Sequence, residues 1–480
     1  MSKPLKVIPL TLVPAGADET LESVRLYADH KKIYPRWVSG VFTRWRIFFV
    51  FATQLFFYGI PWLQVRGEQA LLFDVAHQRF YVFGIIFLPQ DFIYLTALLV
   101  LCAVGLFAWT TIGGRLWCGF SCPQTVYTEI FLWIEQWVEG DRLARMRLDR
   151  SPTTAHKLRL KAAKHALWLV FSLWTGFTFV GYFTPMHALW QHAVSLTLGG
   201  YTLFWVLFYA FATYGNAGWL REQVCKYMCP YARFQSAMFD ADTLVVSYDR
   251  ERGEPRGGRG RAVDYQSEGK GACIDCKLCV QVCPVGIDIR EGLQYECIGC
   301  AVCIDACDSI MDKMRYPRGL IRFTTENALT HTYPETDFRR RLLRPRVLVY
   351  AAILSAVFGV TAFALWQRQP LRVNIAHERI ALVRETADGL LENSYWLQIE
   401  NADHVDHTYR IATEGLPGAQ VLVDGEPAIK VRASADQGVA VRVRVDPAQA
   451  GPGSHRLRFI VTAQDAPCIH TEEKSSFFGR

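Results

Sequence analysis

Eight cysteines between Cys273 and Cys307 are the residues of this chain best suited to metal chemistry. They form two runs, each with the spacing C-x2-C-x2-C-x3-C. Four thiolates hold a cubane 4Fe–4S cluster. A tight loop supplies three of them, and where two such runs occur the fourth cysteine of each run ligates the other cluster. We therefore predict two clusters with crossed ligand sets. The first set is Cys273, Cys276, Cys279 and Cys307, and the second is Cys297, Cys300, Cys303 and Cys283.

Zinc and disulfide bonds are the alternatives for these cysteines. Tetrahedral zinc sites also use four thiolates, but without this crossed spacing. A disulfide framework would spread its cysteines through a small, loop-rich secreted chain, whereas here eight of the 14 are clustered. Asp308 follows the second run where Pro284 follows the first, and this difference leaves the ligands unchanged. Single-electron iron–sulfur chemistry in a reducing compartment is the better interpretation.

Four further cysteines form two matched motifs, Cys118-x3-Cys122-Pro and Cys225-x3-Cys229-Pro. A spacing of four puts both thiols of a pair on one face of a helical turn, and the proline marks a helix break. Four such thiolates could hold a soft ion such as Cu(I), hold a third cluster, or cycle as dithiols. The alternative is that they only pack among apolar side chains. Each motif follows a pair of apolar segments, so we hypothesise a duplication that brings the motifs together.

The remaining candidate residues carry weaker signals. His187 and His192 lie near the ends of apolar segments and could bind a metal or haem, although histidines at such positions are more often solvated. Cys102 is assigned to packing, and Cys468 has no partner in the sequence. The chain contains no phosphate-binding glycine loop, nucleophile triad or zincin motif, and its basic tracts contain no nucleic-acid-binding module. Electron transfer is therefore favoured over hydrolysis and over nucleic-acid binding.

Five segments are long and apolar enough to span a bilayer, which takes about 20 helical residues. They are residues 47–63, 92–111, 165–183, 198–214 and 347–366. Lys and Arg are enriched before the first segment, between the second and third, and at Arg339–Arg341 before the fifth. Because Lys and Arg concentrate on the cytoplasmic side of membrane proteins, we predict a cytoplasmic N-terminus, a C-terminus on the far side, and membrane lipid around the helices.

The rest of the chain divides by composition. Residues 250–270 are rich in Gly and Arg and predict a flexible linker. After Pro370, short alternating runs separated by Gly, Pro and Asp turns predict a β-sandwich. This part carries 12 Lys and Arg against 15 Asp and Glu, while the whole chain has a net charge of +7. The asymmetry matches the predicted topology, in which the basic part contacts the cytoplasm.

The predicted fold is that of a multidomain membrane protein. It combines a five-helix α transmembrane domain, an inserted α+β ferredoxin domain with two 4Fe–4S clusters, and a C-terminal all-β sandwich. The predicted boundaries are 1–46 for a cytoplasmic N-terminal segment, 47–249 for a four-helix membrane domain, 250–270 for the linker, 271–325 for the ferredoxin domain, 347–366 for the fifth membrane helix and 371–480 for the outer domain.

Several longer motifs accompany the cysteines. They are Lys32-Ile33-Tyr34-Pro35-Arg36, Trp117–Val126, Cys229–Gln235 and Arg252-Gly253-Glu254-Pro255-Arg256. Together with the paired cysteine runs, they resemble the FixG family, also called CcoG or RdxA, from about Lys31 to the C-terminus. The resemblance implies a bacterial inner-membrane protein with an Ig-like periplasmic sandwich, acting as an accessory protein in the assembly of cbb3-type cytochrome c oxidase.

The resemblance also implies a cupric reductase, in which the ferredoxin clusters supply electrons that reduce Cu(II) to Cu(I) for the haem–copper centre. Its catalytic and copper-binding residues would be Cys118, Cys122, Cys225 and Cys229. Its partners would be oxidase subunits or copper-delivery proteins, and a cytoplasmic electron donor. Two alternatives stay open. The chain is also similar to membrane ferredoxins of the NapH and NosR type, which take electrons from quinol, and it could be a non-enzymatic assembly scaffold that senses redox state.

Overall fold

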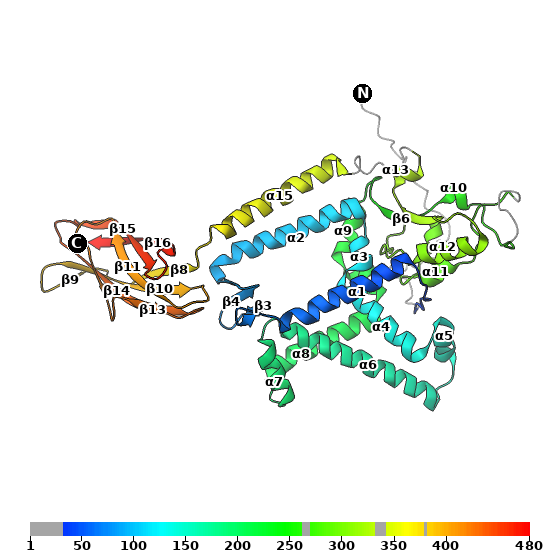
Figure 1. The fold of residues 1–480 in the computed structure, drawn as a ribbon, viewed down its shortest axis with the longest axis horizontal. Coiled ribbons are helices and arrows are strands. Elements are labelled where there is room, and N and C mark those ends of the chain that lie inside the picture. Colours follow the sequence, from blue (N-terminus) through cyan, green and yellow to red (C-terminus); the bar gives the residue numbers. More distant parts are fainter. Residues whose placement is uncertain (1–31, 262–268, 332–341, 379–381) are drawn as a thin grey trace, which may run out of the picture.

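The computed structural model describes residues 32–261, 269–331, 342–378 and 382–480. Three regions follow one another along its long axis (Figure 1): a cysteine-rich domain at one end, a group of long helices in the middle, and a β-sandwich at the other end. Two parts of the sequence predictions lie outside the described residues, namely residues 1–31 of the N-terminal segment and the basic tract Arg339–Arg341.

All five predicted membrane segments contain helices. These are α1 (Val41–Gly59), α2 (Phe92–Gly113), α6 (Ala155–Val180), α8 (Gly200–Thr213) and α15 (Pro345–Trp366). Within the described residues, however, only two helical stretches are both long and apolar enough to cross a membrane, Pro89–Gly113 and Pro345–Trp366. The five-helix transmembrane domain is therefore not confirmed. The reasons are local: α1 carries Arg44 and Arg46, α6 starts with a basic stretch, and α8 has only 14 residues.

The long helices pack in two pairs (Figure 1). Helix α2 lies along α15, where the Tyr94 hydroxyl donates a hydrogen bond of 3.2 Å to the Ala364 carbonyl. Helix α6 lies along α8 at Gly176, where an added Cβ would stand 2.3 Å from the Val206 carbonyl oxygen. Only glycine permits so close an approach of two backbones. Helix α1 contacts α6 and also reaches the cysteine-rich domain.

Short elements connect the long helices at both ends. Near the cysteine-rich domain the chain forms α3 (Leu116–Phe120), α4 (Pro123–Glu139), α5 (Arg142–Arg150), the π-helical stretches η3 (Tyr214–Leu220) and η4 (Val224–Met228), and α9 (Pro230–Met238). At the opposite end it forms η1 (Ile60–Trp62), β1 (Gln64–Val65), β2 (Glu68–Gln69), β3 (Leu71–Asp74), β4 (Arg79–Val82), β5 (Ile85–Phe87), η2 (Pro89–Asp91) and α7 (Met186–Val194). Strands β3, β4 and β5 form an antiparallel sheet.

The cysteine-rich domain begins earlier than residue 271, where the sequence predicted its start. Its strands β6 (Val245–Tyr248) and β7 (Ile321–Thr324) pair antiparallel, and both cysteine loops lie between them in sequence. Its helices are α10 (Arg250–Gly253), α11 (Leu278–Val282), η5 (Ile289–Glu291), α12 (Val302–Met314) and α13 (Glu326–Leu329).

The predicted linker at 250–270 was wrong in its described part. The Ala272 N–H donates a hydrogen bond of 2.7 Å to the Arg252 carbonyl, and the Gly257 N–H donates one of 3.1 Å to the Cys273 carbonyl. Residues 250–261 therefore pack on the cysteine-rich domain. Their backbone groups are hydrogen-bonded to that domain, and amino-acid composition gives no information on such bonds. Residues 262–268 of the linker lie outside the described residues.

The predicted C-terminal β-sandwich is confirmed. Its strands are β8 (Leu371–His377), β9 (Arg384–Glu385), β10 (Leu391–Asn401), β11 (His407–Glu414), β12 (Gln420–Val423), β13 (Ile429–Val431), β14 (Asp436–Val445), β15 (Gly453–Ala463) and β16 (His470–Gly479). One antiparallel sheet has the order β12-β14-β10-β8 with β9 beside β10, and the other has the order β13-β11-β15-β16. The two sheets face each other because each buries one apolar face in the core between them. In β14, for example, the alternate valines from Val439 to Val445 are buried in this core.

Candidate metal centres

The eight clustered cysteines line two small cavities. The first cavity is lined by Cys273, Cys276, Cys279 and Cys307. The second is lined by Cys283, Cys297, Cys300 and Cys303, and Cys279 also reaches its wall. Each set joins three cysteines of one run to the fourth cysteine of the other run. The structure therefore gathers the two crossed sets that the spacing predicts.

The loops that carry these thiols share one backbone conformation. Asp275 and Lys277 in the first loop have φ angles of 52° and 53°, and the corresponding Gly299 and Ala301 in the second have 67° and 60°. Three of these four residues are not glycine, so the left-handed conformation stores strain of the kind that ligand sites retain. A helix starts directly after each loop, α11 after Lys277 and α12 after Ala301.

The two donor sets fit a 4Fe–4S cluster. Burial raises the pKa of Cys283 to about 12 and that of Cys279 to about 11, because a bare thiolate is disfavoured in apolar surroundings. Bound iron would supply the positive charge that four thiolates need, and a cluster would take up and release single electrons. Within the described residues, no three His, Cys, Asp or Glu side chains converge on a point suited to one metal ion. The four thiols of each set instead lie around a cavity, as the ligands of a cluster would.

The motifs at Cys118 and Cys225 share three backbone features, although the first is α-helical and the second π-helical. In both, the second cysteine is the N-cap of a helix that starts with proline, α4 after Cys122 and α9 after Cys229. Its N–H donates a hydrogen bond to the carbonyl five residues earlier, at 2.9 Å in the first motif and 2.8 Å in the second. A residue with positive φ stands four positions before each first cysteine, Gly114 with 57° and Arg221 with 43°. This correspondence supports the hypothesis of an internal duplication.

The two motifs lie together beside the second cavity. Cys118 and Cys225 pack against the same buried residues as Cys283 and Cys300. Burial, followed by the neighbouring thiols, raises the pKa of Cys118 to about 11 and that of Cys225 to about 12. Among the described residues the four thiols of the motifs do not converge on a single-ion geometry. They are neighbours that a bound ion or cluster would have to draw inward.

Direct backbone contact joins the first motif to the loop of the second cavity. A Cβ added at Gly119, between the two cysteines of the motif, would lie 2.8 Å from the Cα atom of Cys300. The guanidinium of Arg115 spans the same junction. Its Nη1 donates to the Cys297 carbonyl at 2.7 Å, and its Nη2 donates to the Ala232 carbonyl, just after the second motif, at 3.1 Å. One side chain therefore ties both motifs to a cluster loop.

Helix α1 docks its N-terminus on the same domain. The carboxylate of Asp305 accepts hydrogen bonds from the N–H groups of Phe42 at 3.2 Å and Thr43 at 2.7 Å, in the manner of a helix cap supplied from another part of the chain. About one turn further along α1 lies Arg46, which is 6% exposed and forms an ion pair of 2.8 Å with Glu129 of α4. The first contact holds α1 on α12 of the cysteine-rich domain, and the second holds it on α4.

Sequence reasoning did not identify Arg46, Arg115, Gly119 or Asp305 as parts of the site. Asp305 and Gly119 lie between candidate ligand cysteines in the sequence, and this position was the one signal that could have identified them as parts of the site. Arg46 and Arg115 lie near the ends of apolar segments, where an arginine is normally interpreted as a marker of membrane orientation and not as part of a site. Their partners are far away in sequence, and no local spacing points to them.

The predicted metal or haem role of His187 and His192 finds no supporting geometry in the described structure. Both side chains are exposed on α7. The His187 ring meets the edge of Trp62, with ring centroids 5.7 Å apart, and His192 Nδ1 shares a hydrogen bond of 3.1 Å with the Thr197 hydroxyl. These contacts are those of solvated histidines at the end of a helix group.

Three family models match the chain. "IG-like fold at C-terminal of FixG" covers residues 361–480, "4Fe-4S dicluster domain" covers residues 220–326, and "4Fe-4S binding domain" covers residues 95–140. The dicluster model includes the eight clustered cysteines together with Cys225 and Cys229. The 4Fe-4S binding model includes Cys118 and Cys122 and none of the eight.

Known proteins resemble the chain over nearly its whole length. Nitrogen fixation protein FixG of Rhizobium meliloti (strain 1021) is 38% identical over 95% of this chain and 91% of its own. Protein RdxA of Cereibacter sphaeroides is 38% identical over 90% of this chain and 94% of its own. A crystal structure of a FixG-related protein from Vibrio parahaemolyticus aligns with 24% of this chain and 99% of its own, with 21% identity and a TM-score of 0.21. The two sets of clustered cysteines, the C-terminal sandwich and this similarity over nearly the whole length show that the chain belongs to the FixG/RdxA family of 4Fe–4S electron-transfer proteins.

Proposed function

We propose that this protein passes single electrons from a cytoplasmic donor to Cu(II), and that the Cu(I) formed serves the assembly of a cbb3-type cytochrome c oxidase. The observation that carries the proposal is the contact of Gly119 with the loop at Cys300. It puts a motif of soft thiol ligands against a loop suited to a one-electron carrier. Thiolates favour Cu(I) over Cu(II), so they stabilise the product of the one-electron reduction.

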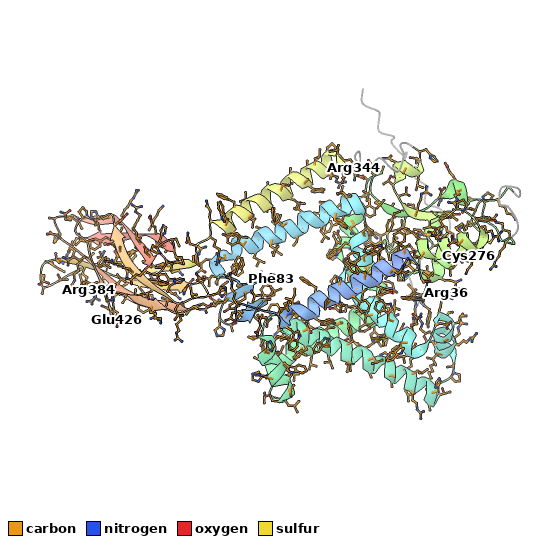
Figure 2. All side chains as sticks on the ribbon, in the orientation of Figure 1. Arg36, Phe83, Cys276, Arg344, Arg384 and Glu426 are labelled. Carbon is orange, nitrogen blue, oxygen red and sulfur yellow. The ribbon has the colours of Figure 1, made fainter. Side chains whose placement is uncertain are left out.

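The order of the two cavities supports a direction for the electrons. Cys276 is an exposed thiol of the first cavity and lies at the outer edge of the molecule (Figure 2). Cys300 of the second cavity is buried and lies beside the motif of Cys118. A soluble donor can therefore approach at the first cavity, while Cu(II) binds at the motifs on the far side of the second.

The thiols of Cys118, Cys122, Cys225 and Cys229 would bind copper and release protons as they do so, because burial keeps Cys118 and Cys225 protonated near neutral pH. The reduction consumes one electron per ion, Cu(II) plus one electron giving Cu(I). A second candidate for the same thiols is a third 4Fe–4S cluster. The match of residues 95–140 to a 4Fe–4S binding model favours it specifically.

We also propose that the long helices are embedded in the bacterial inner membrane as a five-helix domain, with the ferredoxin domain in the cytoplasm and the Ig-like domain in the periplasm. The ferredoxin domain and the sandwich lie at opposite ends of the helices (Figure 1). Helices α2 and α15 meet the length and apolarity that a bilayer requires. The distribution of Lys and Arg supports the orientation.

Replacing all four motif cysteines with serine tests the copper proposal. Because serine is a poor ligand for Cu(I) but similar in size, we expect the visible absorbance and the EPR signals of the two clusters to remain while cupric reductase activity falls to background. The matched control is the double variant Cys102→Ser and Cys468→Ser, since both of these thiols are exposed and lie outside the motifs. Cys102 was predicted to pack, but its exposure on α2 makes it a suitable control. Unchanged copper reduction in the quadruple variant would defeat the proposal.

Iron analysis separates the two candidates for the motif thiols. Two cubane clusters require about eight iron atoms per chain and three require about twelve. The copper proposal predicts about eight iron atoms both in the parent protein and in the quadruple serine variant. A value near twelve that falls to about eight in the variant would assign the motifs to a third cluster instead.

A further inference from the structure

Helix α5 has an inner face that holds the chain leading into α1. Arg142, Arg145 and Asp149 lie on this face, because they are spaced by three and four residues. Arg142 Nε donates a hydrogen bond of 2.9 Å to the Tyr34 carbonyl, and the Asp149 carboxylate accepts one of 2.6 Å from the Tyr34 hydroxyl. Arg145 is buried and pairs with Glu135 of α4 at 3.2 Å. The charges of the inner face therefore have partners within the protein.

The outer face of α5 combines arginines with an apolar side chain. Leu143, Arg147 and Arg150 are spaced by four and three residues, so they share a face, and all three are exposed. Among the described residues, neither arginine side chain has an ion-pair or hydrogen-bond partner. Exposed charges are usually only solvated, but arginines interleaved with an exposed leucine are typical of amphipathic helices at a membrane surface. The outer face therefore has the composition of a membrane-surface helix.

Helix α6 places a further arginine at the edge of an apolar stripe. Arg159 is exposed, and its side chain has no ion-pair or hydrogen-bond partner within the part of the chain that the structure describes. Ala163, Ala166 and Val170 follow it at spacings of four and three residues, so they share its face, and all three are exposed. An exposed apolar stripe suits contact with lipid tails, and a long cationic side chain at its end reaches the head groups.

Two lysines of α6 hold the C-terminal end of α5 at this edge. Lys157 Nζ donates a hydrogen bond of 3.0 Å to the Asp149 carbonyl, and Lys161 Nζ pairs with the Asp149 carboxylate at 2.5 Å. Figure 1 shows α5 beside the N-terminal end of α6. Because the two lysines flank Arg159 in sequence, the end of α5 that carries Arg150 lies at about the level of Arg159 along α6. The outer face of α5 is therefore close to the start of the apolar stripe.

The carboxylates of this region leave an excess of positive charge. Residues 141–164 contain eight Lys and Arg against two Asp. Glu135 and Glu139 of α4 also pair with this stretch, which brings the carboxylates to four. Lys32 and Arg221, from outside the stretch, share these same carboxylates and increase the excess of cations. A surface of this charge attracts anionic head groups in preference to neutral ones.

From these observations we propose that the outer face of α5 and the start of α6 bind the head groups of anionic phospholipids. Arg147 and Arg150 lie one turn apart, and a guanidinium matches the oxygens of a phosphate with two parallel hydrogen bonds. Arg159 contacts a head group above the apolar stripe of α6, and Leu143 enters the boundary between head groups and tails. The inference rests on the proposed membrane position of α6, and it does not require copper reduction.

Photolabelling of the full-length protein in phosphatidylcholine nanodiscs tests the proposal. A trace of photoactivatable phosphatidylglycerol is added in one sample and photoactivatable phosphatidylcholine in another, and labelled peptides are mapped by mass spectrometry. We expect phosphatidylglycerol to label peptides from α5 and the start of α6 at least about fivefold more than phosphatidylcholine does, because several arginines each attract the anionic lipid. Replacing Arg147, Arg150 and Arg159 together with glutamine should bring the two lipids within about twofold of each other.

Two control variants separate this surface from general charge effects. Lysine at the same three positions keeps the charge and should retain most of the preference for phosphatidylglycerol. Glutamine at Arg410, Arg432 and Arg456, three exposed arginines of the sandwich, removes the same charge elsewhere and should leave the preference unchanged. The visible iron–sulfur absorbance of all variants should match that of the parent, which shows that they fold.

Three results would overturn the proposal. The first is equal labelling of α5 and α6 by the two lipids in the parent protein, or an unchanged preference in the glutamine variant of α5 and α6. The second is loss of the preference when millimolar inorganic phosphate is added at constant ionic strength, because the surface would then bind free anions. The third is absence of labelling of α6 by either lipid, which would also contradict the membrane position of α6. Copper reduction in detergent is expected to be the same in all variants.

Discussion

At the scale of single residues, a few charged side chains determine the electrostatics of the candidate metal centres. Arg46 is the clearest case, because its guanidinium is buried, pairs with Glu129 and interacts electrostatically with the thiols of Cys300 and Cys283. A fixed positive charge near a redox centre stabilises its reduced form, which carries one more negative charge. We therefore predict that Arg46 raises the reduction potential of a cluster held by the second set of cysteines.

Arg46→Gln should lower the midpoint potential of one of the two clusters by on the order of 50 mV, about the value that corresponds to a tenfold change in a one-electron equilibrium. EPR-monitored redox titration of the purified protein measures this shift. Arg46→Lys keeps the charge and should retain most of the parent potential. Arg44→Gln, two residues earlier on the exposed face of α1, is the matched control. Two unchanged midpoints in Arg46→Gln would contradict the assignment.

At the scale of elements, the site depends on loops that touch without intervening side chains. Gly119 belongs to α3, inside the first cysteine motif, and its Cα faces the backbone at Gly299 and Cys300. Close backbone contact keeps the distance between motif and cluster loop as short as the chain allows. Any side chain at position 119 must push the two elements apart, since its neighbours are backbone atoms that cannot rotate away.

Gly119→Ala should weaken the second cluster selectively. The added Cβ would stand 2.7 Å from the Gly299 carbonyl oxygen, and such overpacking costs about 1–3 kcal/mol. We expect the EPR intensity of the second cluster to fall by half or more while that of the first stays near its parent value. Gly105→Ala in α2 is the control, because its new Cβ would meet its nearest neighbour only at 4.0 Å. Equal intensities in the two variants would show that the contact is not needed.

At the scale of the whole molecule, the β-sandwich is attached to the helix region at the end opposite the cysteines. Ala402 of the sandwich is buried with Leu72, Tyr81 and Ile86 of the β3–β5 sheet. Arg368, in the segment between α15 and β8, and Arg372 of β8 both pair with the buried Asp91. The label at Phe83 in Figure 2 marks this contact region, between the helices and the sandwich. The sandwich is therefore held against the sheet as well as tethered by α15.

Ala402→Asp should release the sandwich from the helix region without affecting the clusters. A carboxylate placed among these apolar side chains loses its hydration. We expect proteolytic cleavage between α15 and β8 to become at least tenfold faster, with an unchanged cluster EPR spectrum. Ala412→Asp, at an exposed position of β11, should leave the cleavage rate near that of the parent. Equal cleavage rates in the two variants would show that this contact does not hold the domain.

The amino-acid sequence by itself determined the chemistry of this protein. The two crossed cysteine sets, the paired motifs and the order of the domains were all predictable, because ligand spacing within a loop and alternation within a strand are local properties. The membrane region was less predictable. Five apolar segments were expected, but helix ends and charges such as Arg46 leave two stretches that meet the criteria for a span among the described residues.

Only the tertiary structure decided how these parts meet. It placed Gly119 against Cys300, gave Arg115 carbonyl partners in both the cluster loop and the second motif, and capped α1 with Asp305. It also formed a cavity beside η3, whose walls come from four separate parts of the chain. Contacts between residues far apart in sequence depend on how whole helices pack, and packing follows from shape and burial over many side chains. The spacing of residue types along the chain does not predict this packing.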